Sequence, residues 1–162
     1  MRIGVISDTH GLLRPEAEAL LAGVDHILHA GDIGAPGILP RLAGIAPLTA
    51  IRGNIDIAAW ALGLPDEVVV RLAGRAVLML HDLNRLAIDP AAEGIDIVVS
   101  GHSHRPKIEA VGGVLYLNPG SAGRRRFRLP VTLAVLELGG GDPQAEIHDL
   151  LGAPDEAAEA GM

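Results

Sequence analysis

The sequence predicts a single domain of mixed α/β class, and three observations lead to this prediction. The chain has 162 residues, a length that suits one domain. Short β-branched runs bounded by Gly, Asp and Asn recur through its first two thirds, with helical signals between some of them. The last third holds pairs of apolar runs around glycine-rich loops, which are typical of antiparallel strands. These patterns predict either more than one sheet or one large mixed sheet.

Six apolar runs in the first two thirds predict buried strands, because they are too short for helices and alternate little. The runs are Ile3–Ile6, His26–His29, Leu48–Ile51, Val68–Leu72, Ala76–Leu80 and Ile95–Val99. Between the first two runs, Pro15 suits the first position of a helix, and an apolar stripe from Ala17 to Val24 follows helical spacing. Gly23 is the expected end of this helix.

Two weaker helical patterns follow. Asp89 and Pro90 suit a cap and a first helical position, which predicts a short helix ending near Gly94. Residues 36–43 are a less certain helix, because Pro40 would break an interior turn.

The last third predicts two strand pairs. Gly112 and Gly113 separate residues 107–111 from 114–117, and a Gly-Gly pair permits the tight turn of a hairpin. Residues 131–138 and 144–148 flank a second loop of Gly, Asp and Pro. We expect residues 1–153 to form the domain, and the alanine-rich residues 154–162 to form a flexible acidic tail.

Composition excludes several classes of function. With 20 acidic and 13 basic residues, the formal charge is -7, which argues against extended nucleic acid or anionic membrane as a partner. The absence of cysteine excludes disulfides, a cysteine nucleophile and a thiolate metal site. The first apolar run ends at Ser7 and is too short for a secretory signal. We expect a cytoplasmic protein without a membrane span, and a homo-oligomer remains open.

Polar side chains follow five of the apolar runs. The carboxyl ends of strands in open α/β sheets face one crevice, so we expect these side chains to converge. Carboxylate, amide and neutral imidazole are ligands for Mn, Fe, Zn or Co. The alternative is that these are ordinary turn residues and structural histidines. They would then have to coincide by chance with the ends of five predicted strands. Seven side chains suffice for two ions if one carboxylate bridges: Asp8, His10, Asp32, Asn54, His81, His102 and His104.

In this order the motifs resemble those of calcineurin-like metallophosphoesterases. They are Asp8-x-His10, Gly31-Asp32, Gly53-Asn54, His81 and Gly101-His102-Ser103-His104. The chain is most similar to the small single-domain bacterial and archaeal phosphodiesterases, whose relatives include the retromer scaffold subunit. Asn118-Pro119-Gly120-Ser121 matches a motif of that subgroup.

The resemblance implies a four-layer αββα sandwich of two mixed β-sheets flanked by helices. It also implies two divalent metal ions, with Mn²⁺ expected and Fe, Zn, Co or Ni as alternatives. One ion would lie among Asp8, His10, Asp32 and His104, and the other among Asp32, Asn54, His81 and His102.

The predicted reaction is hydrolysis of a phosphodiester of a small molecule or nucleotide by a hydroxide that bridges the two ions. Larger phosphatases of the superfamily have a histidine acid where this chain has Ile55, which cannot move a proton. Protonation of the leaving group would then fall to water, His10 or Asp56, which favours diesters and good leaving groups. Two alternatives stay open: a catalytically silent protein-binding scaffold of the same fold, and a phosphomonoesterase.

Other residues have weaker assignments. We expect Asn54, Asn118, Ser121 and Arg124 to contact the substrate. The arginines of Arg124–Arg128 would bind phosphate oxygens, although a solvated basic loop explains them more simply. Asp56 either orients a ligand such as His10 or holds a turn, and His29 is expected to be structural.

Overall fold

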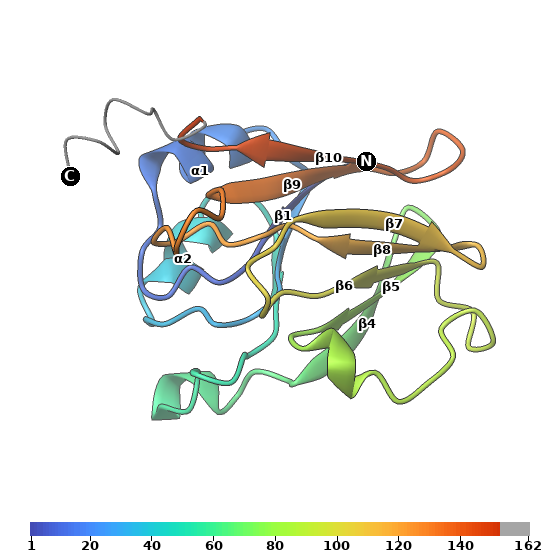
Figure 1. The fold of residues 1–162 in the computed structure, drawn as a ribbon, viewed down its shortest axis with the longest axis horizontal. Coiled ribbons are helices and arrows are strands. Elements are labelled where there is room, and N and C mark those ends of the chain that lie inside the picture. Colours follow the sequence, from blue (N-terminus) through green and yellow to red (C-terminus); the bar gives the residue numbers. More distant parts are fainter. Residues whose placement is uncertain (153–162) are drawn as a thin grey trace.

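The computed structural model describes residues 1–152 and contains two five-stranded mixed sheets packed face to face (Figure 1). The strand order is β10-β9-β1-β2-β3 in the first sheet and β4-β5-β6-β8-β7 in the second. The prediction of two mixed sheets is therefore confirmed. The tail expected at 154–162 lies outside the described residues.

The first sheet has a parallel half and an antiparallel half. The parallel strands are β1 (Arg2–Ile6), β2 (His26–His29) and β3 (Leu48–Ala50), and the antiparallel ones are β9 (Thr132–Glu137) and β10 (Gln144–Asp149). Because β1, β2 and β3 run the same way, the loops that follow them leave from one edge of the sheet.

The second sheet repeats this arrangement. Its parallel strands are β5 (Arg75–Leu80), β6 (Ile97–Val99) and β8 (Val114–Asn118), and its antiparallel edges are β4 (Glu67–Leu72) and β7 (Lys107–Val111). The predicted hairpin is present as β7 and β8. The segments after β5 and β6 therefore also leave the sheet together.

Two short α-helices pack on the outer face of the first sheet, α1 (Pro15–Leu21) and α2 (Ile38–Ala43). Pro15 occupies the first helical position, as predicted. Pro40 does not break α2, because it lies at the third position of the helix. The backbone N–H groups of a first turn have no intrahelical partner, so proline removes no hydrogen bond there.

The helix predicted after Asp89 is wrong, since residues 90–94 form consecutive turns. One helical bond joins the Glu93 N–H to the Asp89 carbonyl, but the Ile95 N–H returns to the Pro90 carbonyl at 2.8 Å. Gly94 has φ of 74°, which ends any helical path. A segment this short cannot offset the cost of helix nucleation.

The outer face of the second sheet is thinly covered. Its apolar cluster includes Ala76, Leu78 and Val98, and the segment above it is the 3-10 helix η2 (Leu83–Arg85) followed by turns. A second 3-10 helix, η1 (Ala59–Ala61), follows β3. No helix in the described part of the chain is long and apolar enough to cross a membrane.

Candidate metal centre

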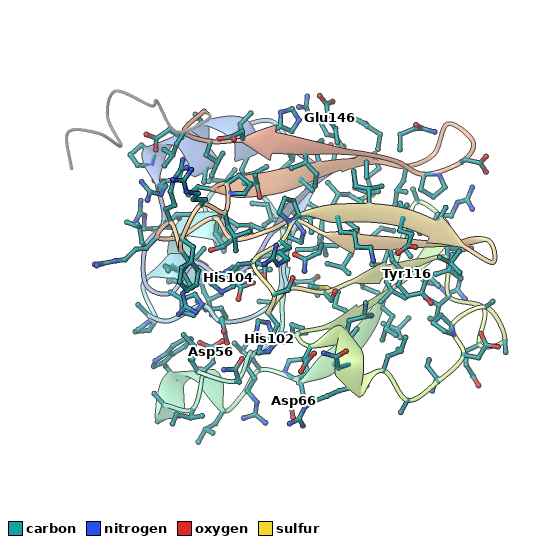
Figure 2. All side chains as sticks on the ribbon, viewed as in Figure 1. Asp56, Asp66, His102, His104, Tyr116 and Glu146 are labelled. Carbon is teal, nitrogen blue, oxygen red and sulfur yellow. The ribbon has the colours of Figure 1, made fainter. Side chains whose placement is uncertain are left out.

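The polar clusters that follow the strands meet at one end of the two sheets, where Figure 2 labels His102 and His104. Their donor atoms form two groups, within each of which the atoms lie within 4.8 Å of one another. Asn54 joins them, because its Oδ1 lies 3.2 Å from Nδ1 of His102. The structure thus brings together all seven predicted ligands. The groups are Asp8, His10 and His104, and Asp32, His81 and His102.

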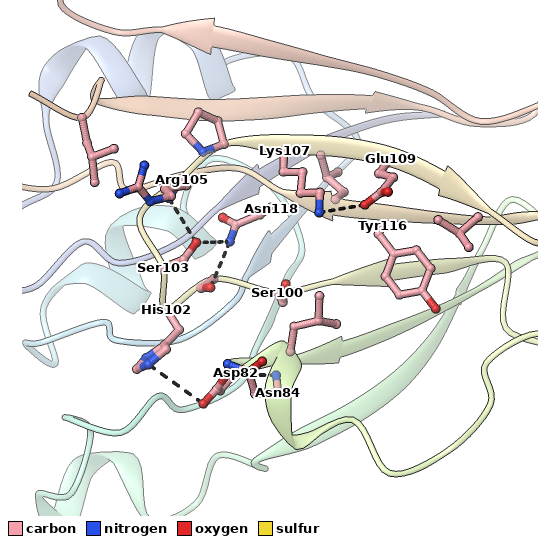
Figure 3. A pocket seen from close by; sticks show the side chains of 16 residues that line it. Asp82, Asn84, Ser100, His102, Ser103, Arg105, Lys107, Glu109, Tyr116 and Asn118 are labelled. Carbon is pink, nitrogen blue, oxygen red and sulfur yellow. Dashed lines mark hydrogen bonds and ion pairs between the residues drawn. The ribbon is translucent and has the colours of Figure 1, made fainter.

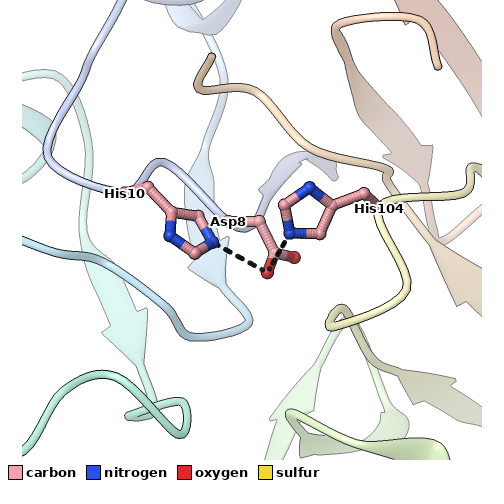
Figure 4. Close-up of side chains that lie close together, drawn as sticks. All are labelled: Asp8, His10 and His104. Atoms are coloured by element: carbon pink, nitrogen blue, oxygen red, sulfur yellow. Dashed lines mark ion pairs between the residues drawn. The ribbon is translucent and has the colours of Figure 1, made fainter. Parts of the chain in front are cut away.

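Asp8 has one anchored oxygen and one that faces the site. Oδ2 accepts hydrogen bonds from the Ser7 hydroxyl at 2.7 Å and the His102 backbone N–H at 3.1 Å. Oδ1 is buried without a hydrogen bond in the described chain. It faces Nε2 of His10 at 3.6 Å and Nε2 of His104 at 3.3 Å (Figure 4). The anchoring of Oδ2 therefore aims Oδ1 at the two histidines.

Asp32 is held in the same way. It belongs to the second group but also reaches His10 of the first. Its Oδ1 accepts a hydrogen bond from the Ile55 backbone N–H at 3.1 Å. Its Oδ2 lies 3.4 Å from Nε2 of His10 and 3.2 Å from Nε2 of His81. One carboxylate oxygen therefore touches a histidine of each group.

The tautomer of His81 follows from its backbone contact. Nδ1 lies 2.7 Å from the Ala30 carbonyl, which can only accept, so Nδ1 carries the hydrogen. In the neutral ring, Nε2 then presents its lone pair to Asp32. Burial lowers the pKa of His81, but the contact with Asp32 and the field of Asp8 outweigh it, so the metal-free pKa is raised.

These atoms suit a divalent cation. Among residues 1–152, Asp8 Oδ1 and Nε2 of His10 and His81 are buried without a hydrogen-bond partner, a costly state for polar atoms. Two ligands about 2.1 Å from one ion, at angles near 90–110°, lie roughly 3.0–3.4 Å apart. Three of the contacts between carboxylate and imidazole, at 3.2, 3.3 and 3.4 Å, fall in this range.

Both carboxylates are ionised at neutral pH. Burial raises the pKa of Asp8, but contacts with His10, His104, His81 and Ser7 lower it further than burial raises it. Burial also raises the pKa of Asp32, and His81 with the Ile55 N–H lowers it below its usual value. The charged form is the one that binds metal.

The backbone is strained at most of the predicted ligands. A non-glycine residue with positive φ is uncommon, and such conformations store on the order of 1–3 kcal/mol each. Only two other non-glycine residues in the described chain, Ala73 and Phe127, share this conformation. Strain of this kind concentrates at functional sites. The strained ligands are Asp8 (54°), His10 (47°), Asp32 (55°), His102 (69°) and His104 (63°).

Gly101 lets the loop after β6 approach the Asp8 side chain. A Cβ at this position would lie 2.6 Å from Asp8 Oδ2 and would overlap the Ser7 hydroxyl. No side chain fits there without displacing the carboxylate.

Asp56 has a different role from the catalytic one expected of it. Oδ2 accepts hydrogen bonds from the backbone N–H groups of Ile33 at 3.0 Å and Gly53 at 2.9 Å, and Oδ1 accepts from Gly34 at 3.0 Å. The residue is 2% exposed. A buried carboxylate with three backbone donors holds the loops after β2 and β3 together and is not placed to protonate a leaving group.

Asn118 and Ser121 also hold loops, and their contact with substrate stays a prediction. Nδ2 of Asn118 donates to the Gly101 carbonyl at 2.9 Å and to the Ser103 hydroxyl at 3.1 Å. The Ser121 hydroxyl donates to the Asp8 carbonyl at 2.9 Å. Arg124 is exposed, and its role stays a prediction.

Thr9 and His29 form a buried pair behind the site, of which the sequence analysis identified only His29. The Gly31 N–H donates to Nδ1 of His29 at 3.1 Å, so Nε2 carries the hydrogen and faces the Thr9 hydroxyl at 3.0 Å. Thr9 in turn donates to the Ile33 carbonyl at 2.8 Å. Burial lowers the pKa of His29 to about 4. His29 is structural, as expected, but no sequence signal singles out Thr9 or Ser7 beside Asp8.

Comparison with known proteins agrees with this geometry. Residues 1–141 match the model of the calcineurin-like phosphoesterase superfamily domain. The chain belongs to this superfamily. It is 35% identical, over 91% of each chain, to a protein of Methanothermobacter thermautotrophicus named as a probable metallophosphoesterase.

Two solved structures resemble this member of the superfamily in architecture. A structure described as a novel archaeal phosphodiesterase has a TM-score of 0.75 at 23% identity, over 91% of this chain and all (100%) of that one. Wild-type Vps29 of Entamoeba histolytica complexed with Zn²⁺ has a TM-score of 0.71 at 23% identity, over 93% and 99% of the two chains. At these identities the likeness shows the fold.

Membership in the calcineurin-like phosphoesterase superfamily implies divalent metal ions and hydrolysis of phosphate esters. The two donor groups are the places in this member where such ions would bind.

Proposed function

We propose that this chain is a phosphodiesterase that uses two divalent metal ions, with Mn²⁺ first among the candidates, to hydrolyse a small phosphodiester. The observation that carries the proposal is the position of Asp32 Oδ2, 3.4 Å from His10 of one donor group and 3.2 Å from His81 of the other. A carboxylate in this position would bridge two ions. The carboxylate and amide oxygens suit Mn²⁺, and the imidazole nitrogens also suit Zn²⁺, Fe²⁺ or Ni²⁺, which stay as alternatives.

The proposed ligands divide between the two ions, with Asp32 shared. When bound, two ions in such a site make water a nucleophile near neutral pH and stabilise the charge that develops on the phosphoryl oxygens. The first set is Asp8, His10, Asp32 and His104, and the second is Asp32, Asn54, His81 and His102.

The chain's own residues favour diesters over monoesters. Ile55 is 41% exposed beside the metal ligands and has no proton to give. Asp56 is occupied by three backbone N–H groups, and His10 faces both carboxylates as a proposed ligand. Since none of these three residues is placed as an acid, water would protonate the leaving group. Esters whose leaving group is stable as an anion, such as aryl phosphodiesters, would then react fastest.

A catalytically silent protein-binding scaffold is the second candidate, because Vps29 shares the fold. The complete set of donor atoms argues for the enzyme. Since that Vps29 structure is itself described as a Zn²⁺ complex, metal binding alone does not separate the two functions, and hydrolysis must be measured.

The test is hydrolysis of bis(p-nitrophenyl) phosphate by chelator-treated protein to which Mn²⁺ is added back. We expect Asp32→Asn to lower kcat/KM by more than about 100-fold. The matched control is Asp142→Asn in the loop between β9 and β10, which should leave the rate near wild type. A wild-type protein that binds Mn²⁺ but hydrolyses nothing would favour the scaffold. Faster hydrolysis of an alkyl phosphomonoester than of the diester would favour the monoesterase.

A further inference from the structure

A groove of about 740 Å³ extends from the candidate metal centre along the outer face of the second sheet (Figure 3). Its lining includes His102 of the centre, Tyr116 of β8 and Glu109 of β7, and Leu83 of η2. Tyr116 of β8 pairs with Val98 of β6 and Glu109 of β7. The groove is open because η2 and the turns after it lie over the β5–β6 side of this face, whereas the residues of β7 are exposed.

A second groove, of about 710 Å³, also reaches the centre. It is lined by Asn54 and His81 of the centre and by Arg52 and Asp66. Asp82 and His102 line both grooves. A phosphate at the centre therefore adjoins two grooves, one for each ester arm of a diester.

The charges in both grooves are largely compensated. In the first, Lys107 pairs with Glu109 at 2.7 Å. In the second, Arg52 donates two hydrogen bonds to the Asp66 carboxylate, from Nε at 2.8 Å and from Nη2 at 3.2 Å. Neither groove is strongly basic, so neither suits an arm that carries further phosphates. The first groove instead offers the Tyr116 ring and the apolar side chain of Leu83, which is 37% exposed.

We propose that the first groove holds an uncharged aromatic arm of the substrate, an aryl group or a nucleobase, in contact with the ring of Tyr116 and the side chain of Leu83. This assignment rests on the proposed phosphodiesterase function and makes Tyr116 and Leu83 determinants of specificity. The other arm lies in the polar second groove. The substrate class is a phosphodiester with a single negative charge and at least one planar ring.

The test is calorimetric titration of the Mn²⁺-loaded protein with diphenylphosphinate and diethylphosphinate, which carry the same single charge, have no ester bond to hydrolyse and differ in their rings. Aromatic pairs contribute about 0.5–1.5 kcal/mol, so Tyr116→Val should weaken binding of diphenylphosphinate about 2- to 13-fold and that of diethylphosphinate hardly at all. Tyr116→Phe keeps the ring and should bind like wild type. Leu83→Ser, at an exposed position that lines the groove, should show the same selective loss. Val69→Thr, at an exposed position of β4, is the control for a changed strand residue.

Equal loss of both ligands in Tyr116→Val and in Leu83→Ser, or no loss of either, would overturn the aromatic-arm assignment. Hydrolysis of bis(p-nitrophenyl) phosphate by the wild type is followed separately. Hydrolysis with no selective loss refutes the groove assignment alone. Absence of hydrolysis refutes the proposed function, and the groove assignment with it.

Discussion

The Ser121 hydroxyl donates a hydrogen bond to the backbone carbonyl of Asp8 at 2.9 Å, across 113 positions of the chain. Asp8 itself has positive φ, so its conformation needs support from the surrounding structure. Ser121 follows β8 in the Asn-Pro-Gly-Ser turn, and the Ala122 N–H bonds the Ser7 carbonyl at 3.0 Å. The turn therefore fixes the loop from which Asp8 reaches the candidate metal centre.

Ser121→Ala should weaken metal binding without removing any ligand. Loss of the hydroxyl frees the Asp8 carbonyl and loosens the strained loop, and supporting partners of metal ligands typically change affinity about 10- to 100-fold. We expect a loss near the lower end, measured by titrating chelator-treated protein with Mn²⁺. Thr49→Val is the control, because it removes a hydroxyl that contacts His26 away from the site. Unchanged affinity in Ser121→Ala would show that the loop keeps its shape without this bond.

Gly101→Ala should damage both stability and metal binding. The added methyl group would lie 2.6 Å from Asp8 Oδ2, and overpacking of this kind costs about 1–3 kcal/mol. Thermal unfolding of the metal-free protein and Mn²⁺ titration would measure the two effects. Gly63→Ala is the matched control, because a Cβ there meets nothing within 4 Å. A variant as stable and as metal-binding as Gly63→Ala would contradict the packing described here.

Much of the fold can be predicted from the sequence, because the core strands are short, apolar and bounded by polar residues and glycine. β2 begins and ends where the apolar run His26–His29 predicts, and α1 begins at Pro15. The weaker helix prediction that holds and the one that fails both depend on position within a turn. Pro40 is tolerated because it lies in the first turn of α2, and the segment after Asp89 fails as a helix because Gly94 redirects it. Neither outcome follows from residue type alone.

The candidate site can be predicted only in part from the sequence. The order of Asp, Asn and His after successive strands predicts which side chains converge, since parallel strands share an edge. The direction of a polar side chain is not encoded in its type. Asp56 binds backbone N–H groups, and Asn118 binds the loop after β6. The left-handed backbone of residues such as His102 is also unpredictable, because histidine rarely adopts it.

Mn²⁺ should raise the unfolding temperature, because it binds the folded chain and relieves the repulsion between buried acceptors at Asp8 and Asp32. At a free concentration 100 times Kd, each bound ion adds about 2.7 kcal/mol, and each kcal/mol shifts Tm by roughly 2–4 °C in a domain of this size. We expect a rise of about 5–10 °C for each ion bound in scanning calorimetry, reversed by chelator. Asp32→Asn should show little of it and Asp142→Asn all of it. An equal rise in both variants would place the binding elsewhere.

His29 should make the metal-free protein less stable on mild acidification. Burial holds the pKa of His29 at about 4 in the folded chain, below the usual histidine value of 6.5. Between these two pH values the unfolded chain binds more protons than the folded one, so the free energy of unfolding falls as the pH falls. The loss begins near pH 6.5 and is complete near pH 4, and this group contributes on the order of 3 kcal/mol to it.

His29→Gln isolates this contribution, because it removes the titration while Asp8 and Asp32 titrate alike in both proteins. Urea unfolding in the presence of chelator, from pH 7 to pH 4, should show the wild type losing its advantage over His29→Gln steadily as the pH falls. The Gly31 N–H now donates a hydrogen bond to Nδ1 of His29. Protonation of His29 would place a hydrogen on Nδ1, which would then repel that N–H. His148→Gln on β10 should track the wild type at every pH. A constant difference between wild type and His29→Gln across this range would mean that His29 does not titrate on unfolding.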